Sequence, residues 1–288
     1  MPVRTLLRLL ATCCVLALVG TAAVWGVVLL LRASDGELLP AERCTALLDG
    51  VHQPLSHEQA ENAALLAGRA LGRGMPARAV TIAIATAMQE SSLRNLEHGD
   101  RDSLGLFQQR PSQGWGSPEE VLDPVHATEA FYDALEKVPG YRDMAVTEAA
   151  QAVQRSAFPD AYAQHEQLAR AWASALTGHS PGAVTCVDHE PVVGDLPAFL
   201  ERVERDLGAV ARVEEGLVVL DATALTHGAE GAGRVAWGLA QWAVAVSPVQ
   251  GVAEVHVADR RWTAGDAWRA AGASLPEGIV HVRLVTEP

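Results

Sequence analysis

The chain has 288 residues, a formal net charge of −13 and 49% hydrophobic residues. These values fit a folded globular protein with one large domain or two modest ones. Nucleic-acid binding requires a basic face, so the acidic balance excludes a nucleic-acid partner from the expected functions. Among the 22 basic residues only Lys137 is a lysine.

Residues 1–36 are predicted to form a cytoplasmic tip and a signal anchor. No charged residue occurs from Leu9 to Leu31, a run that matches the roughly 20 apolar residues needed to cross a bilayer. Arginines before the run predict a cytoplasmic N-terminus, a single pass through the cell membrane and an extracytoplasmic bulk. The alternative is a signal peptide cleaved near residues 21–23, which would release a secreted protein.

Two cysteines remain in the part of the chain that is predicted to be exported, Cys44 and Cys186. In an oxidising compartment a pair of thiols predicts a disulfide. Such a bond would join the start and the end of residues 37–187 and mark them as a unit. Two buried free thiols are the alternative.

Residues 37–187 are predicted to form an all-helical domain. A capping-box pattern at Ser56 and Gln59 opens a helix through about Leu71. The next helix, Ala77–Ser91, is apolar nearly all round, so we expect it to be the central buried helix of the domain. Further helices are expected at residues 117–122, 125–136, 147–155 and 159–175, and no strand is expected between residues 44 and 186.

Residues 188–288 are predicted to form a small α+β accessory domain. Helices are expected at residues 196–207, 233–246 and 266–271, and strands at residues 217–220, 253–257 and 279–285. The predicted fold class is therefore α+β and multidomain, with a transmembrane helix, an all-α domain and a small α+β domain.

Glu90 ends the apolar helix, between Gln89 and Ser91. A carboxylic acid that lies against an apolar helix and is partly shielded from water has a raised pKa. Such an acid can donate a proton to a glycosidic oxygen near neutral pH. The alternative is a solvent-exposed residue at a helix end, paired with Arg94 four residues on.

Two motifs occur in register along this part of the chain. Gln89-Glu90-Ser91 ends the helix, and Gly105-Leu106-Phe107-Gln108 follows, with Pro111 after it. The pattern resembles the lytic transglycosylase branch of the lysozyme superfamily, in the form of a domain common in exported cell-wall proteins of actinobacteria. The resemblance covers about residues 60–175. It implies a lysozyme-like helical fold, with Glu90 as the catalytic acid/base, Ser91 orienting the site, and Gln108 and Phe107 lining the sugar groove.

Five further side chains are candidates for this site. Asp102 and Asp100 are the nearest candidates for a second carboxylate, with pairing to Arg101 and Arg110 as the alternative. Trp115 would stack on a sugar or belong to the core. The family's later Ala-Tyr-Asn-Ala-Gly-like motif is missing, and Tyr162 or Phe158 would take its aromatic role. The expected substrate-binding set is Ser91, Gln108, Phe107, Trp115, Tyr162 and Asp102.

The resemblance implies cleavage of the MurNAc–GlcNAc bond in peptidoglycan glycan strands. A lytic transglycosylase would leave a 1,6-anhydro end, whereas a muramidase would add water. The missing motif supports a second hypothesis, a non-catalytic peptidoglycan-binding or scaffold protein with the same groove. The histidines lack metal-ligand spacing, so no metal or cofactor is expected. The last 100 residues or so resemble domains found beside wall-active domains, which implies a wall-binding or partner-binding module.

Overall fold

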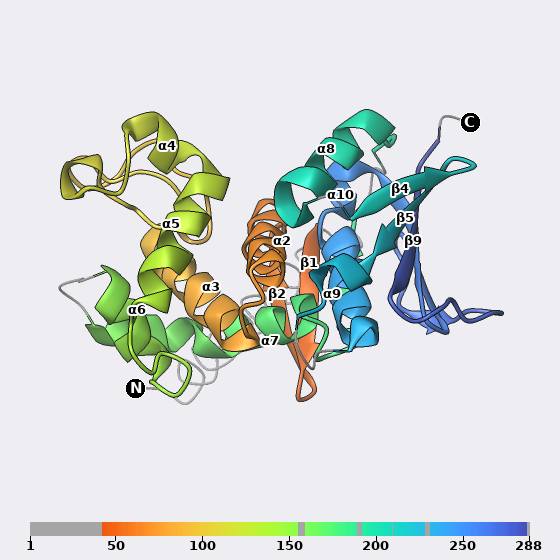
Figure 1. The fold of residues 1–288 in the computed structure, drawn as a ribbon, viewed down its shortest axis with the longest axis horizontal. Coiled ribbons are helices and arrows are strands. Elements are labelled where there is room, and N and C mark those ends of the chain that lie inside the picture. Colours follow the sequence, from red (N-terminus) through yellow and green to blue (C-terminus); the bar gives the residue numbers. More distant parts are fainter. Residues whose placement is uncertain (1–41, 155–158, 189–191, 209, 228–230, 287–288) are drawn as a thin grey trace, which may run out of the picture. The chain divides into compact units, whose positions relative to one another are not determined.

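The computed structural model describes residues 42–154, 159–188, 192–208, 210–227 and 231–286 (Figure 1). The chain from Glu42 onwards forms one compact unit. Within the described ranges no helix has the length and apolar character needed to cross a membrane. The predicted membrane span at residues 9–31 lies outside these ranges.

The helices predicted before residue 155 are confirmed with small shifts at their ends, whereas the helix predicted at 159–175 is divided into a 3-10 turn and a shorter α-helix. They are α2 (His57–Gly72), α3 (Ala77–Ser91), α4 (Pro118–Leu122), α5 (Pro124–Glu136), α6 (Val146–Gln154) and α7 (Glu166–Leu176), with 3-10 turns η1 (Pro111–Gln113) and η2 (Pro159–His165). Capping boxes start two of them, with Ser56 and Gln59 before α2 and Ser117 and Glu120 before α4. Local capping chemistry therefore determines where these helices begin.

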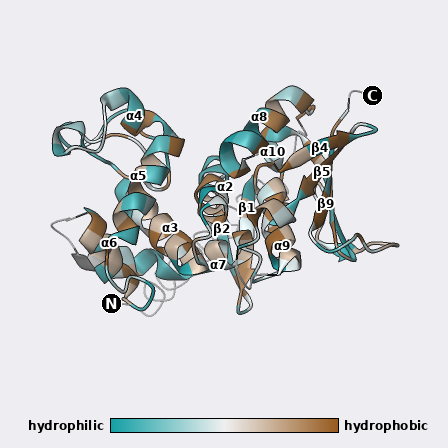
Figure 2. Ribbon diagram, viewed as in Figure 1, coloured by the Kyte–Doolittle hydropathy of each residue, from teal (hydrophilic) through white to brown (hydrophobic). Residues whose placement is uncertain are grey.

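Helix α3 is the central helix, as expected from its composition. It contacts α2, α5, α6, α7 and η2. Every residue from Ala79 to Ala87 is buried. Figure 2 shows α3 largely in hydrophobic colours, whereas α4 and the loop beside it are largely hydrophilic. The polar end of α3 therefore meets a polar loop, which places Glu90 at the border of the core.

The prediction of an all-α domain in residues 37–187 is wrong. Strands β1 (Arg43–Leu48), β2 (Val51–Leu55) and β3 (Val184–Val187) form an antiparallel sheet in the order β2-β1-β3. The turn between β1 and β2 is Asp49-Gly50, with φ of 52° and 77°. Two successive positive φ angles are typical of the type I′ turn that joins two-residue hairpins.

The predicted disulfide between Cys44 and Cys186 is confirmed. The two cysteines face each other in register on β1 and β3. Both are buried, and 142 residues of sequence separate them. The bond therefore closes a loop that includes α2 to α7.

Replacing both cysteines with alanine is expected to lower the free energy of unfolding by about 2–5 kcal/mol, because the unfolded chain regains the entropy of a long loop. Chemical denaturation of the oxidised wild type and the variant measures the loss. Reduced wild type should fall to the level of the variant, and the variant should not respond to reductant. Equal stability of oxidised and reduced wild type would contradict the prediction.

The second half of the described chain carries a larger antiparallel sheet (Figure 1). Its strand order is β4-β5-β9-β6-β7-β8. The elements are α8 (Leu196–Leu207), β4 (Ala211–Glu214), β5 (Leu217–Asp221), η3 (Ala222–Leu225), α9 (Ala232–Ala245), α10 (Ser247–Gln250), β6 (Val252–Val257), β7 (Arg260–Thr263), β8 (Arg269–Ala270) and β9 (Ile279–Leu284). The three predicted strands and the first two predicted helices are confirmed. The predicted helix at 266–271 is wrong, because Arg269–Ala270 pairs with β7 as a short strand.

Helix α9 connects the two sheets. It contacts β5, β6 and β9 of the larger sheet, β3 of the smaller sheet, and helices α2 and α7. The buried side chain of Gln241 accepts from the backbone N–H groups of Ala183 and Val184 at 2.7 and 3.0 Å and donates to the Ala175 carbonyl at 2.6 Å. One hydrophobic core includes residues from Cys44 to Val282. The predicted fold class, an all-α domain beside a separate small α+β domain, is therefore wrong.

Candidate active site

Glu90 lies in the last turn of α3 and is half-buried. The Tyr162 hydroxyl donates to Glu90 Oε1 at 2.8 Å, and the side chain of Gln154 forms a second hydrogen bond to the carboxyl group. Burial raises the pKa of Glu90 above its ordinary value of 4.5, and the two hydrogen bonds oppose this rise only in part. Glu90 is thus protonated to a greater extent than an exposed glutamate at the same pH.

The alternative role for Glu90, an ion pair with Arg94, is not adopted. Arg94 lies 3.6 Å from Glu58 instead, and both side chains of that pair are about half exposed. The hydrogen-bond partners of Glu90 in the described residues are therefore neutral side chains rather than a cation. A neutral environment leaves burial as the dominant influence on its pKa.

Tyr162 and Gln154 reach Glu90 from outside α3. Gln154 is the last residue of α6, and its Nε2 also donates to the Phe107 carbonyl at 2.7 Å. Tyr162 lies in η2 and is fully buried, so it contacts the acid rather than an open groove. Sequence reasoning did not assign Gln154 a role. The only signal for it was a polar residue at the end of an alanine- and valine-rich helix. Phe158, the other aromatic candidate, lies outside the described residues.

Ser91 joins the end of α3 to the second motif. It is buried, and its hydroxyl donates to the Leu106 carbonyl at 2.7 Å and accepts from the Arg94 N–H at 3.1 Å. Gly105 has a φ of +76°, and a Cβ there would lie 2.5 Å from the Val121 carbonyl oxygen. The turn therefore requires glycine, and Ser91 fixes its position relative to Glu90.

Gln108 and Phe107 have different environments. Phe107 is fully buried and stacks on Phe131, with ring centroids 4.4 Å apart, so it belongs to the core. Gln108 is half-buried, and its Nε2 lies 3.4 Å from the His98 carbonyl and 3.3 Å from the Gly105 carbonyl. Gln108 thus braces the loop between the two motifs.

Asp102 is part of an ion pair within the loop. Arg110 Nε donates to it at 2.7 Å and the Ser112 N–H at 2.8 Å. The hydrogen bonds from Ser112, and then that from Arg110, hold the pKa of the Asp102 carboxyl well below its usual range. Asp100 is almost fully exposed and lies 3.9 Å from Arg101. Both aspartates thus adopt the pairing that was the alternative to a role as second carboxylate.

A pocket of about 660 Å³ shares one side chain, that of Gln154, with the surroundings of Glu90. Its lining comes from η1 and the loop after it, from the end of α5, and from α6: Gln113, Trp115, Ala134, Lys137, Val138, Ala152, Val153 and Gln154. Gln154 connects the two, because it lines the pocket and hydrogen-bonds to Glu90. Trp115 is half-buried against the core and presents the rest of its ring to the pocket.

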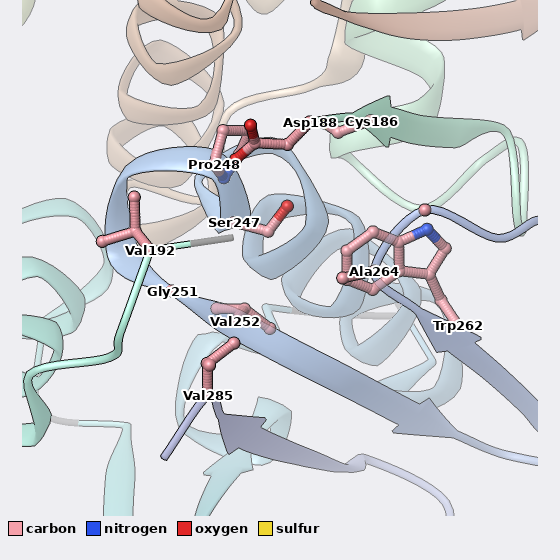
Figure 3. A pocket seen from close by; sticks show the side chains of 11 residues that line it. Cys186, Asp188, Val192, Ser247, Pro248, Gly251, Val252, Trp262, Ala264 and Val285 are labelled. Atoms are coloured by element: carbon pink, nitrogen blue, oxygen red, sulfur yellow. The ribbon is translucent and has the colours of Figure 1, made fainter. Parts of the chain in front are cut away.

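A second cavity of about 270 Å³ lies near the disulfide (Figure 3). Its lining is mostly apolar, with Val192, Val252 and Val285 among it, and Ser247 adds a hydroxyl group. Asp188 is its one carboxylate. The acid with a raised pKa, Glu90, hydrogen-bonds to Gln154 of the larger pocket, so the chemistry favours that pocket as the reactive site.

No protein-family model matches the chain, and no curated protein matches its sequence. Across the described ranges no group of three or more histidine, cysteine, aspartate and glutamate side chains is arranged to hold a metal ion. Glu90, its hydrogen-bond partners Tyr162 and Gln154, and the pocket that Gln154 lines form the candidate site.

Replacing Tyr162 with phenylalanine is expected to move the basic limb of the pH–activity profile to higher pH. The Tyr162 hydroxyl stabilises the ionised form of Glu90 and lowers its pKa, so its loss raises that pKa further. The pH dependence of kcat/KM measures the shift. Tyr141→Phe is the matched control and should leave the limb in place. A limb that is unchanged or lies at lower pH in Tyr162→Phe would contradict the assignment.

Proposed function

We propose that the protein cleaves the glycosidic bond between MurNAc and GlcNAc in peptidoglycan, with Glu90 as the acid and then the base. The observation that carries this proposal is a half-buried carboxyl group with a raised pKa, held by two neutral side chains, one of which, Gln154, lines a polar pocket. The disulfide supports a place outside the cytoplasm, where thiols are oxidised and where this substrate lies.

In the first step Glu90 donates its proton to the O4 oxygen of the leaving GlcNAc, and the bond from C1 of MurNAc to that oxygen breaks. In the second step the Glu90 carboxylate accepts the proton of the MurNAc 6-hydroxyl as O6 bonds to C1. The products are a 1,6-anhydro end and a free 4-hydroxyl, and Glu90 returns to its protonated form. No water is consumed.

The placement of the acids favours this intramolecular attack over hydrolysis. A hydrolase needs a second carboxylate, as a nucleophile or as a base for water. The nearest candidate, Asp102, is bound by Arg110 and by the Ser112 N–H. The hydrogen bonds of Glu90 to Tyr162 and Gln154 supply no second acid. One carboxyl group suffices for the transglycosylase route because the substrate provides its own nucleophile.

A second candidate function is glycan binding without turnover. Glu90 is not among the residues that line the pocket, and Gln154 stands between them. A groove that holds glycan strands through Trp115, Gln113 and Gln154 would serve a scaffold role. The lost Asn-Ala-Gly motif also supports this candidate.

Digestion of purified peptidoglycan by the wild type and by Glu90→Gln, with the products identified by mass spectrometry, separates these functions. We expect 1,6-anhydro ends from the wild type alone. Reducing ends would indicate hydrolysis. Intact glycan in both samples, together with co-sedimentation of protein and peptidoglycan, would replace the enzyme proposal with the binding function.

A further inference from the structure

Lys137 is the one charged residue that lines the pocket of about 660 Å³, to which Gln154, a hydrogen-bond partner of Glu90, also belongs. It is the C-cap of α5 and is exposed to solvent. It is also the only lysine in a chain that carries a net charge of −13. The pocket thus differs in charge from the protein around it.

The acids nearest to Lys137 along α5 are bound elsewhere. Arg73 contacts Asp133 at 2.7 Å and Glu136 at 2.5 Å, and it also pairs with Glu129 at 2.6 Å. Among the ion pairs of the described residues, none involves Lys137. Its charge is therefore directed to the pocket and solvent rather than to the acids on its own helix.

We propose that Lys137 binds a carboxylate on the muramoyl residue of the glycan, and this rests on the proposed function. Two carboxylates of the substrate have this chemistry, that of the lactyl group and that of the stem peptide. An ammonium group on a flexible stem suits a carboxylate that is itself on a mobile substituent. Gln113 and Gln154 offer amides for hydroxyl and N-acetyl groups, and Trp115 offers an apolar surface for a sugar ring.

A simpler role for Lys137 is to stabilise the C-terminus of α5 through the helix dipole. That role affects thermal stability equally whether or not glycan is bound. Binding of a carboxylate instead makes affinity depend on the charge of the glycan substituent. A measurement that compares acid and amide forms of the same glycan distinguishes the two roles.

The test is isothermal titration calorimetry on the Glu90→Gln protein, which removes turnover. Four probes are used: a GlcNAc–MurNAc tetrasaccharide with free lactyl carboxylates, the same with lactyl amides, the tetrasaccharide with stem peptides ending in a carboxylate, and the same with peptide amides. Introducing Lys137→Met into the Glu90→Gln protein should weaken the binding of one of the two acid probes by about tenfold, because one charge-assisted hydrogen bond is lost. The affinity of its amide partner should not change.

Three comparisons complete the test. Lys137→Arg should retain most of the preference for the acid form, and Arg269→Met, which removes an exposed charge on β8, should leave all four affinities unchanged. If the acid form binds more tightly than the amide form only in the lactyl pair of probes, Lys137 binds the lactyl carboxylate. If it does so only in the peptide pair, Lys137 binds the stem-peptide carboxylate. Equal binding of acid and amide forms, or an equal loss with all four probes in Lys137→Met, would overturn the inference. Cleavage by the wild type is scored separately, so the proposed function stands or fails independently of this result.

Discussion

Glutamine at position 90 is expected to abolish glycan cleavage while it stabilises the fold at neutral pH. General acid–base catalysis contributes about 10²- to 10⁴-fold, so kcat should fall by at least about 100-fold. Glutamine has the size of glutamate and can still accept the Tyr162 hydrogen bond through its carbonyl oxygen. The loss of activity should therefore occur without loss of structure.

The effect on stability follows from the raised pKa of Glu90. Between the pKa of the unfolded chain, near its ordinary value of 4.5, and the higher folded value, the native state binds more protons than the unfolded state. The free energy of unfolding of the wild type therefore decreases as the pH rises through this window. Glutamine carries no charge at any pH, so the variant lacks this decrease.

Thermal unfolding between about pH 4 and pH 8 measures this difference, because it compares the protein on both sides of the window. At the upper end of this pH range we expect Glu90→Gln to have a higher Tm than the wild type. At the lower end of the range the two Tm values should converge. Glu97→Gln, in an exposed loop, should keep the wild-type pH dependence and activity. A Glu90→Gln variant that is less stable at neutral pH would show that the carboxylate is stabilised in the fold rather than strained.

Sequence patterns predicted most of the elements that have local causes. Capping boxes and apolar periodicity located α2, α3 and α4 because the hydrogen bonds of a helix end depend on residues three apart. They also identified Glu90 as an acid at the border of the core. The Asp49-Gly50 turn is a local signal for the hairpin of β1 and β2, but β1, Arg-Cys-Thr-Ala-Leu-Leu, does not alternate strictly between apolar and polar residues, so periodicity alone does not predict a strand there.

Other features depend on contacts between distant parts of the chain. Tyr162 lies 72 residues from Glu90, and nothing in the local pattern indicates that its hydroxyl contacts the acid. The burial of Phe107 depends on its stacking with Phe131 on α5. Likewise, strand β3 forms by backbone pairing with β1, a strand from a distant part of the chain, and this pairing brings Cys186 opposite Cys44. Periodicity describes one element at a time and cannot assign these partners.

The substitution Asp206→Ala is expected to lower the free energy of unfolding more than any other single change outside the site. Asp206 is fully buried at the end of α8. Its carboxylate accepts from Arg202 Nε at 2.7 Å, Arg205 Nε at 2.8 Å and Trp242 Nε1 at 3.0 Å. Removing it leaves Nε of the buried Arg202 and the buried indole N–H of Trp242 without their acceptor, which costs about 3–5 kcal/mol.

This carboxylate also explains why the two halves of the chain fold together. Asp206 orients Arg202, which lies on the same helix, α8, and Arg202 donates to Glu61 on α2 at 2.7 Å. Asp206 also accepts from Trp242, which lies on α9. A Cβ at Gly68 on α2 would lie 2.7 Å from the Asp206 carbonyl oxygen, so the helices pack closely. Loss of Asp206 should therefore loosen the contact of α8 with both α2 and α9.

Chemical denaturation of Asp206→Ala measures the loss, and Asp206→Asn separates charge from shape, since its amide keeps the volume of the side chain. Asp133→Ala is the matched control. Asp133 also pairs with an arginine, but its side chain is 59% exposed, and an exposed ion pair contributes only about 0–1 kcal/mol. Equal losses in the two alanine variants would mean that burial does not strengthen the Asp206 network. A large loss in Asp206→Ala with the native circular dichroism retained would show that one buried carboxylate holds α8 against α2 and α9.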